Sequence, residues 1–345
     1  MTMSRRTLLS AGAAAATMLA TRRPSAAVES PQLVVGTWGG DYGQLLAELI
    51  DRPLLVPKGY EVVQDVANGD TRRTKLQVER QSRRGSMDVA CLSDTDAYLV
   101  AQAGTFEQAT ADKVSRLDAV YPELKKETTI PHIYSAQVIL YNTNKVTAPP
   151  QAYADLWDPK WRGRIGFSDI LYNANTMAAA LAGGGNTSNF DPADKKLMEL
   201  RSLDVKIYPS NEALAAALKS EEVWLTVMWL ARGFMWKKAG IPLAHVVPKE
   251  GTPSIVFEAA VPRNAKNKEG AFAYLNAMLD PAAQIAFADK MGYVPTVKDA
   301  VLPDDLAKQV SLAEAERARL LKTDYAYTMA RTNQTLDFWN KQFKG

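Results

Sequence analysis

The sequence predicts an α/β fold, and three observations lead to this prediction. Short apolar runs typical of strands alternate with segments of helical periodicity along the chain, which is the pattern of α/β proteins. The chain has no internal repeat and no low-complexity linker. Its 345 residues, of which 47% are hydrophobic and 23% charged, suit one large or two medium globular domains.

The first strand, predicted over residues 32–36, runs into a glycine-bearing loop and then a helix. The loop covers residues 37–43 (TWGGDYG), and the helix after it places four apolar residues on one face. Open α/β sheets bind ligands at the carboxyl ends of their strands, so Trp38, Asp41 and Tyr42 are candidate ligand contacts. A core aromatic is the alternative interpretation of Trp38.

Two more strands are predicted over residues 60–64 and 87–92, with a polar helix over residues 71–81 between them. The later strand contains Cys91, the single cysteine, which we expect to be a small buried hydrophobe rather than a nucleophile. It ends at residues 93–96 (SDTD), directly before an apolar helical segment. Ser93 and Asp94 therefore have two candidate roles, capping this helix and contacting a ligand.

The middle of the chain continues the alternation. Strands are predicted over residues 136–142, 165–169, 205–208 and 223–228, and helices over residues 176–181 and from Asn211, as its cap, to Lys219. Asp169 ends the second of these strands. Trp229 ends the fourth, and Arg232 follows three residues later.

The stretch from residue 245 to residue 296 has the most distinctive order of elements. A short strand, a turn at residues 248–251 (PKEG) and an apolar run over residues 255–261 come first. Pro262 ends the run because it cannot donate to a sheet ladder. A helix is predicted over residues 268–279, and a second one begins at Pro281 and ends at Gly292.

This series resembles the C-terminal half of periplasmic solute-binding proteins of ABC importers, particularly the polyamine-binding group. The matching residues, in order, are Pro248-Lys249-Glu250-Gly251, Val261-Pro262, Ala265-Lys266-Asn267, Tyr274-Leu275-Asn276, Leu279 and Pro281. Residues 139–146 (ILYNTNKV) and 156–165 (LWDPKWRGRI) resemble two further segments of the family.

The resemblance implies a two-lobed periplasmic binding protein fold of type II, in which each lobe is a mixed sheet flanked by helices and a cleft separates the lobes. We expect residues 28–137 and 259–304 to form the first lobe, and residues 138–258 and 305–345 the second. The tail from residue 305 is expected to be helical and to pack on the second lobe. The implied protein is a monomer that closes on a small solute and hands it to an ABC permease in the inner membrane, with no catalysis, cofactor or metal.

Residues 1–27 are predicted to be an export signal, which places the mature protein in the periplasm. They contain a twin-arginine pattern at residues 4–9, a short apolar run at residues 8–20 and small residues at 25–27, although the choice between the twin-arginine and general export routes stays open. Without this segment the basic residues fall from 41 to 37 against 38 acidic ones, a net charge near −1. We therefore expect no overall basic field and no nucleic-acid partner.

Two other function classes have little support in the residues. An enzyme would need a nucleophile, a base and an orienting group, or a metal site, and the two histidines, His132 and His245, are both expected to be structural. A ferric-ion binder would need clustered tyrosines. The nearest pair, Tyr325 and Tyr327, lies in the predicted tail helix.

The resemblance also suggests which residues contact the solute. Carried over residue by residue, it points to Trp38, Tyr42 and Ser93 in the first lobe and to Asp169 and Trp229 in the second. One position departs from the family. Where the polyamine binders have an aspartate five residues before their Ile-Pro, this chain has Phe257. Glu258, beside it, is expected to face the other way because side chains alternate along a strand. Both Phe257 and Glu258 are candidate ligand contacts.

The loss of one anion and the presence of Arg232 change the expected charge of the solute. A guanidinium suits a carboxylate, and Asp169 remains for an ammonium group. We therefore expect a zwitterionic amine such as the ω-amino acid 4-aminobutyrate, with putrescine or spermidine as the alternative. A surface position on a helix is the alternative interpretation of Arg232.

Overall fold

The computed structural model describes residues 32–345, so the predicted export signal lies outside the described residues. Within them, strands and helices alternate, which confirms the α/β prediction. Six strands follow one path in the main sheet, in the order β10-β4-β9-β3-β1-β2. Their bounds are β1 Gln32–Thr37, β2 Glu61–Val66, β3 Val89–Ser93, β4 Ile130–Asn142, β9 Thr252–Ala260 and β10 Val294–Pro295.

Three more strands pair with β4 or β9, which we call the crossing strands because they run between the two groups of helices. β7 (Leu225–Trp229) and β8 (Leu243–Val246) pair with β4, and β11 (Leu320–Leu321) pairs with β9. The short strands β5 (Gly166–Ser168) and β6 (Lys206–Tyr208) form a separate parallel pair. β1 runs parallel to β2 and β3, whereas β4 and β9 are antiparallel to each other, so the main sheet is mixed.

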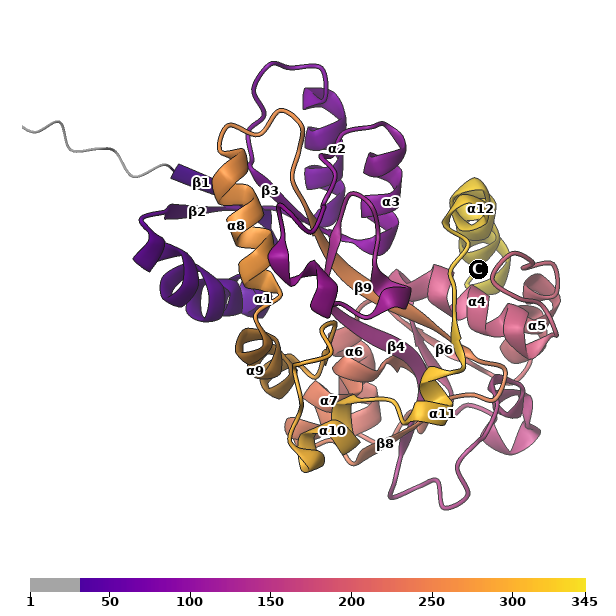
Figure 1. Ribbon diagram of the computed structural model, residues 1–345. Helices are drawn as coiled ribbons and strands as arrows, with labels where there is room; N and C mark the ends of the chain where they lie inside the picture. The colour runs from indigo at the N-terminus through magenta and orange to yellow at the C-terminus, as the bar shows by residue number, and fades with distance from the viewer. Residues whose placement is uncertain (1–31) are drawn as a thin grey trace, which may run out of the picture.

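The helices gather around the two ends of this sheet (Figure 1). The α-helices are α1 Gly40–Leu46, α2 Gly69–Glu79, α3 Asp94–Gln102, α4 Tyr172–Ala182, α5 Ala193–Arg201, α6 Asn211–Lys219, α7 Leu230–Lys238, α8 Lys268–Met278, α9 Pro281–Met291, α10 Asp304–Val310, α11 Glu314–Arg317 and α12 Tyr325–Phe338. The π-helical segments are η1 Ala47–Leu55 and η8 Trp339–Phe343. The 3₁₀ segments are η2 Val56–Lys58, η3 Ser115–Ala119, η4 Pro122–Leu124, η5 Tyr153–Trp157, η6 Pro159–Trp161 and η7 Asp169–Leu171.

Both faces of the first-lobe sheet are covered by helices, because β3 alternates its side chains between two cores. Val89 and Cys91 point into a core with α1, α8 and α9. Ala90 and Leu92 point into a smaller core with α2 and α3. Cys91 is fully buried, which confirms that prediction, and burial raises the pKa of its thiol to about 11.

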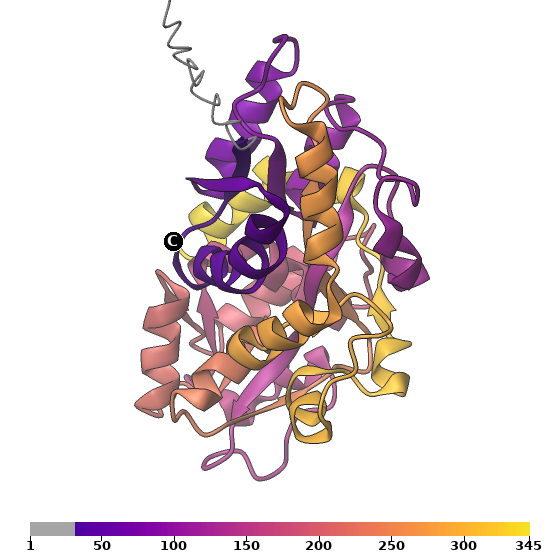
Figure 2. The same cartoon turned by 60° about the vertical axis from the view of Figure 1, so that its left-hand side comes forward.

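β4 connects the first-lobe core to the cores of the second lobe. Its early residues Ile130 and Ile133 belong to the first-lobe core, whereas Ile139 packs with α4, α5 and β7. The strand begins at Ile130 rather than at residue 136, because its first half pairs with β9 and its second half with β7 and β8. Figures 1 and 2 show the long β4 running between the two groups of helices. The lobe boundaries at residues 137/138 and 258/259 stay a prediction.

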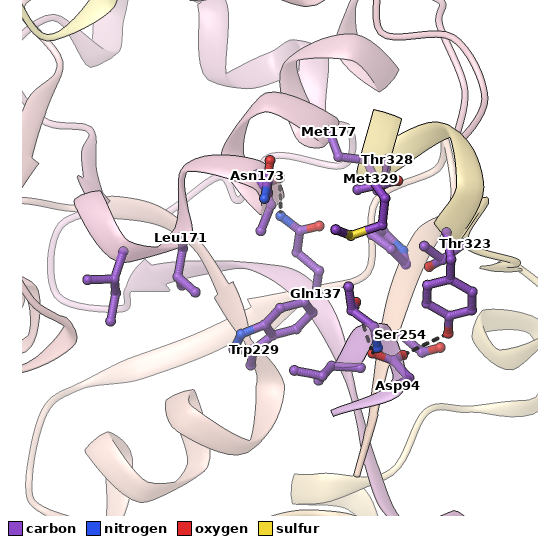
Figure 3. Close-up of a pocket in the computed structure, with 16 residues that line it drawn as sticks. Asp94, Gln137, Leu171, Asn173, Met177, Trp229, Ser254, Thr323, Thr328 and Met329 are labelled. Atoms are coloured by element: carbon purple, nitrogen blue, oxygen red, sulfur yellow. Dashed lines mark hydrogen bonds between the residues drawn. The ribbon is translucent and has the colours of Figure 1, made fainter. Parts of the chain in front are cut away.

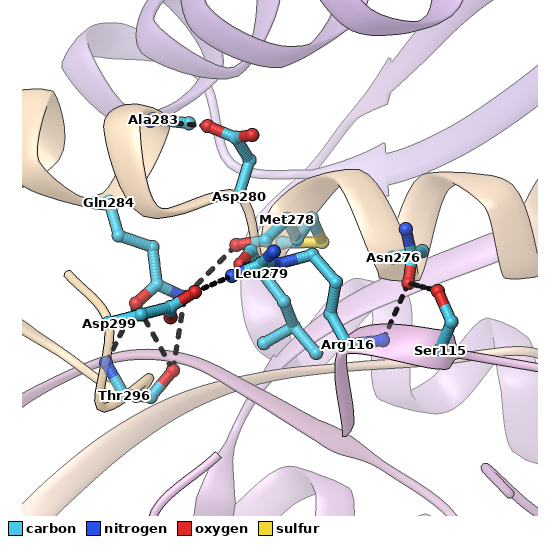
Figure 4. A network of polar contacts seen from close by, with 10 residues as sticks. All are labelled: Ser115, Arg116, Asn276, Met278, Leu279, Asp280, Ala283, Gln284, Thr296 and Asp299. Atoms are coloured by element: carbon cyan, nitrogen blue, oxygen red, sulfur yellow. Dashed lines mark hydrogen bonds and ion pairs between the residues drawn. The ribbon is translucent and has the colours of Figure 1, made fainter. Parts of the chain in front are cut away.

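The motif that carries the family resemblance is mostly structural. Asp88 accepts hydrogen bonds from the backbone N–H groups of Lys266 and Asn267, at 2.8 Å each, and so holds the loop before α8. The side-chain oxygen of Asn276 accepts from the Arg116 backbone at 2.9 Å, and Arg116 donates to the Leu279 carbonyl at 2.6 Å (Figure 4). These bonds fix α8 and its end to η3.

The start and the end of α9 follow the sequence-based expectation. Asp280 caps the helix, with its side chain accepting from the Ala283 N–H at 3.0 Å, and Pro281 takes the first helical position. Gly292 ends it in the left-handed conformation, with φ of 73°. One cap is different: the hydroxyl of Ser210, rather than Asn211, caps α6. Asn211 already lies inside the helix.

The tail is helical only in part. β11 interrupts it by pairing with β9 through Leu320 and Leu321, so the expectation of a helical tail is wrong at this point. The end of the tail packs on the second lobe, where Trp339 and Phe343 enter its core. Figure 1 shows α12 next to α4. Within residues 32–345 no helix combines the length and the apolar character needed to cross a membrane.

Candidate functional site

A cavity of about 190 Å³ lies where the crossing strands meet both lobes and the tail (Figure 3); we call it the Asp94 pocket. Asp94 and Thr95 come from the start of α3, and Gln137 and Pro253–Ile255 come from the crossing strands β4 and β9. The remaining lining residues are Ile170, Leu171, Asn173, Ala174, Met177, Trp229, Thr323, Tyr325, Thr328 and Met329. The pocket therefore combines residues that are far apart in the sequence.

The floor of the pocket is the point where β4 changes partners. Ala136 pairs with Ser254 of β9, and the next residue, Gln137, pairs with Trp229 of β7. Trp229 ends β7, as predicted, and its side chain lines the pocket.

Asp94 is a buried carboxylate whose oxygens already have donors. One oxygen accepts from the Thr95 N–H at 2.8 Å, and the other accepts from the Tyr325 hydroxyl at 2.9 Å and the Val256 N–H at 3.2 Å. Burial raises the pKa of Asp94, and the nearby charge of Lys126 opposes this effect. Tyr325, which the sequence suggested only as a weak candidate for iron, thus joins the tail to the first lobe.

Ser93 caps α3, as predicted for one of its two roles. Its hydroxyl accepts from the Asp96 N–H at 3.2 Å and donates to the Asp96 carboxylate at 2.9 Å. Contact between Ser93 and a solute stays a prediction.

Glu258 lies behind Asp94 rather than in the pocket. Only 1% of it is exposed, the hydroxyl of Thr129 donates to it at 2.7 Å, and Lys126 forms an ion pair with it. Burial raises the pKa of Glu258 to about 7, against the opposing effect of Lys126. The Lys126 ammonium also lies 4.9 Å from the centre of the Tyr325 ring. Direct contact between Glu258 and a solute therefore has no support in this packing.

Phe257 faces the opposite side of β9, as the alternation predicts. Its ring packs edge-on against Trp38 at 5.2 Å and against Tyr293 at 5.2 Å. Trp38 is partly buried, with the Arg72 guanidinium 4.5 Å from its ring. None of these side chains lines the Asp94 pocket. The predicted contacts of Trp38 and Phe257 with a solute stay predictions.

Tyr42 and Asp41 are neighbours in α1 and differ in exposure. Tyr42 is 6% exposed, and its hydroxyl is 2.9 Å from Nδ1 of His132, so it belongs to the first-lobe core. His132 is itself fully buried, which agrees with a structural role, and burial lowers its pKa to about 3. Asp41 is exposed to solvent. Neither Tyr42 nor Asp41 lines the pocket.

The carboxylate of Asp169 contacts the tail, and its predicted contact with a solute stays a prediction. Its carboxylate accepts from the Trp339 indole at 2.7 Å and forms an ion pair with Lys344 at 2.5 Å, so both oxygens are used by the tail. Asp169 is not among the residues that line the pocket. The sequence does not reveal that the last residues fold back onto this strand end.

Arg232 lies on the first turn of α7, partly buried and without an ion pair among residues 32–345. Its charge acts on Tyr293, where burial raises the pKa of the hydroxyl and Arg232 opposes that effect. Arg232 therefore lies beside the aromatic group of Phe257 and Tyr293, outside the Asp94 pocket.

The sequence analysis missed several lining residues, above all Gln137 and the tail residues Thr323, Thr328 and Met329. Gln137 lies inside an apolar run, where one polar residue at a strand position was the available indication. The tail residues gave no such indication, since their place depends on how the tail folds.

The family model described as bacterial extracellular solute-binding protein matches residues 58–314. The spermidine/putrescine-binding periplasmic protein of Escherichia coli (strain K12) is 27% identical over 236 residues, covering 66% of this chain and 67% of that protein. A crystal structure of an ABC transporter from Clostridium perfringens has a TM-score of 0.77 at 23% identity, covering 90% of this chain and 99% of that one. The Atu4243-GABA receptor has a TM-score of 0.76 at 20% identity, covering 90% and 96%. These structures support the two-lobed fold.

Proposed function

We propose that this chain, which belongs to the family of bacterial extracellular solute-binding proteins, captures a small amine-bearing solute in the Asp94 pocket and delivers it to an ABC permease. Its relatives include periplasmic polyamine-binding proteins, which act by binding rather than by catalysis. Periplasmic location, with residues 1–27 as the export signal, belongs to the same proposal.

One observation carries this proposal: the charge of the pocket lining. Among residues 32–345, the lining has one carboxylate, Asp94, and no lysine, arginine or histidine. A carboxylate favours a cationic ligand group, and the described lining itself has no basic side chain to compete, although the charge of Lys126 acts on Asp94 from outside the lining. The ring of Trp229 adds a surface over which an ammonium group or its methylenes can lie.

The size and charge balance favour a short ω-amino acid such as 4-aminobutyrate. The volume of about 190 Å³ is below the roughly 300 Å³ at which pockets for drug-sized ligands begin. A diamine carries two positive charges and would leave one of them without a carboxylate in this lining. A zwitterion carries one, and its carboxylate would extend toward Arg232 when the lobes close.

Putrescine or spermidine is the second candidate. It is favoured by the 27% identity to the spermidine/putrescine-binding protein of Escherichia coli (strain K12) and by the place of Arg232 outside the pocket lining. If Arg232 stays outside after closure, the pocket offers a carboxylate and neutral acceptors only, which suits an amine without an acid group.

A thermal-shift panel followed by calorimetry tests both candidates. The panel contains 4-aminobutyrate, putrescine, spermidine, an aminophosphonate and succinate, and the best compound is then titrated into the wild type, Arg232→Ala and Lys237→Ala. Lys237 is the control because it is an exposed cation on the same helix.

If Arg232 holds the solute carboxylate, Arg232→Ala weakens binding of 4-aminobutyrate by about 2–5 kcal/mol and spares putrescine, while Lys237→Ala changes neither. Equal affinity of wild type and Arg232→Ala for 4-aminobutyrate replaces the zwitterion proposal with the polyamine one. Stabilisation by succinate alone overturns the amine-bearing solute.

A further inference from the structure

The side-chain amide of Gln137 lines the pocket, and only one of its two polar atoms has a hydrogen-bond partner among residues 32–345. It is 1% exposed, and its amide nitrogen donates to the Ala174 carbonyl at 2.7 Å. A carbonyl oxygen accepts only, so the nitrogen must face Ala174, and the amide orientation follows from chemistry. Its oxygen, Oε1, is buried and has no hydrogen-bond partner within residues 32–345.

This oxygen is held in place by the strand. The backbone carbonyl of Gln137 accepts from the hydroxyls of Tyr153 and Thr252, which fix β4 at this residue. In Figure 3, Oε1 points away from Asn173 and toward the part of the pocket that Met329 lines. A methionine side chain has no N–H or O–H to donate, and its unbranched thioether can move aside.

A second polar atom of the same pocket also has no partner. The hydroxyl of Thr328, on α12, is buried and without a hydrogen bond among the described residues. A buried acceptor without a donor costs free energy, and native proteins avoid this unless a water, ion or ligand supplies the partner. The oxygens of Asp94, by contrast, already accept from three other residues.

We infer that Oε1 of Gln137 accepts a hydrogen bond directly from the ammonium group of the bound solute. Asp94, whose oxygens already accept other hydrogen bonds, contributes its negative charge without a direct hydrogen bond to the solute. This inference rests on the proposed function, because it needs an amine-bearing solute in the Asp94 pocket. It makes Gln137 a residue that selects for N–H donors: primary amines bind, and quaternary amines of the same length lose this bond.

Calorimetry on the full chain tests the inference. The probe is 4-aminobutyrate or putrescine, whichever binds the wild type more tightly, together with its analogue in which one amine is trimethylated. The variants are Gln137→Met, which keeps a similar shape and removes the acceptor, and Gln334→Met, a control that makes the same substitution at an exposed position of α12 outside the lining. The quantity compared is the ratio of Kd for the trimethylated and the primary amine.

We expect Gln137→Met to reduce this ratio by about 10- to 100-fold, the effect of one hydrogen bond to a charged group, and Gln334→Met to leave it unchanged. A purely structural role would weaken both compounds equally, and an unchanged ratio overturns the inference while the proposed function stands. Failure of the wild type to bind any amine probe overturns both.

A crystal structure of the wild-type complex gives the answer if Gln137→Met does not fold. The amine nitrogen is expected within about 3.2 Å of Oε1. An amine bound elsewhere in the pocket, with Oε1 still unpaired, overturns the inference.

Discussion

Replacing Glu258 by glutamine should change how the stability of this protein depends on pH. Glu258 is fully enclosed beside Lys126 and Thr129, and burial raises its pKa from 4.5 to about 7. Between these two values the folded protein keeps the Glu258 proton, whereas the unfolded chain has lost it. Stability from this group is therefore greatest below pH 4.5 and is lost as the pH rises to about 7.

The magnitude follows from the two pKa values. They differ by about 2.5 pH units, and each unit corresponds to about 1.36 kcal/mol, which gives about 3 kcal/mol across the window. The wild type should lose this amount of unfolding free energy between pH 4.5 and 7 relative to Glu258→Gln, whose side chain does not titrate. Urea unfolding at half-unit pH steps measures it.

Glu107→Gln is the matched control. A hydrogen bond from Lys268 lowers the pKa of Glu107, so its contribution is present above pH 4.5 and is lost only as the pH falls further. The difference between wild type and Glu107→Gln should stay constant from pH 5 to 8. A constant difference between wild type and Glu258→Gln over the same range would refute the reasoning, because Glu258 would then be ionised in the folded protein at all these pH values.

Three further predictions follow from the pocket and the cores. Trp229→Ala should weaken solute binding by about 1–3 kcal/mol in calorimetry, with Trp157→Ala, outside the pocket, as a control that does not; equal affinity of both variants would remove Trp229 from the site. Iodoacetamide at pH 8 should label Cys91 only in urea, because burial raises its thiol pKa to about 11, and labelling of the folded protein would contradict its enclosed position. Saturating solute should reduce the radius of gyration in small-angle scattering as the lobes close; an unchanged curve would count against closure.

Local order in the sequence was enough to place most elements. The strand before Ser93, the helix α8, the restart at Pro281 and the end at Gly292 all depend on short-range rules for caps, prolines and periodicity, and they were predicted within a few residues. The opposite orientations of Phe257 and Glu258 followed from strand alternation alone.

The site was harder to predict, because it depends on contacts between distant segments. Trp229 and Asp94 were identified at strand ends, but Gln137 lies where β4 changes from β9 to β7, and no local pattern marks that point. The sequence shows no sign of a partner for the carboxylate of Asp169, which accepts hydrogen bonds from Trp339 and Lys344, 170 and 175 residues later. The tail also supplies Tyr325 to Asp94, a contact that local propensity cannot reveal.

The most direct test of the proposed function is a calorimetric titration of the wild-type protein with 4-aminobutyrate and, separately, with butyrate. The two compounds share the carbon chain and the carboxylate and differ in the amine. A pocket whose described lining has Asp94 as its one carboxylate and no basic side chain predicts saturable binding of 4-aminobutyrate and no measurable binding of butyrate. Binding of butyrate as tight as that of 4-aminobutyrate would contradict recognition of an amine in this pocket.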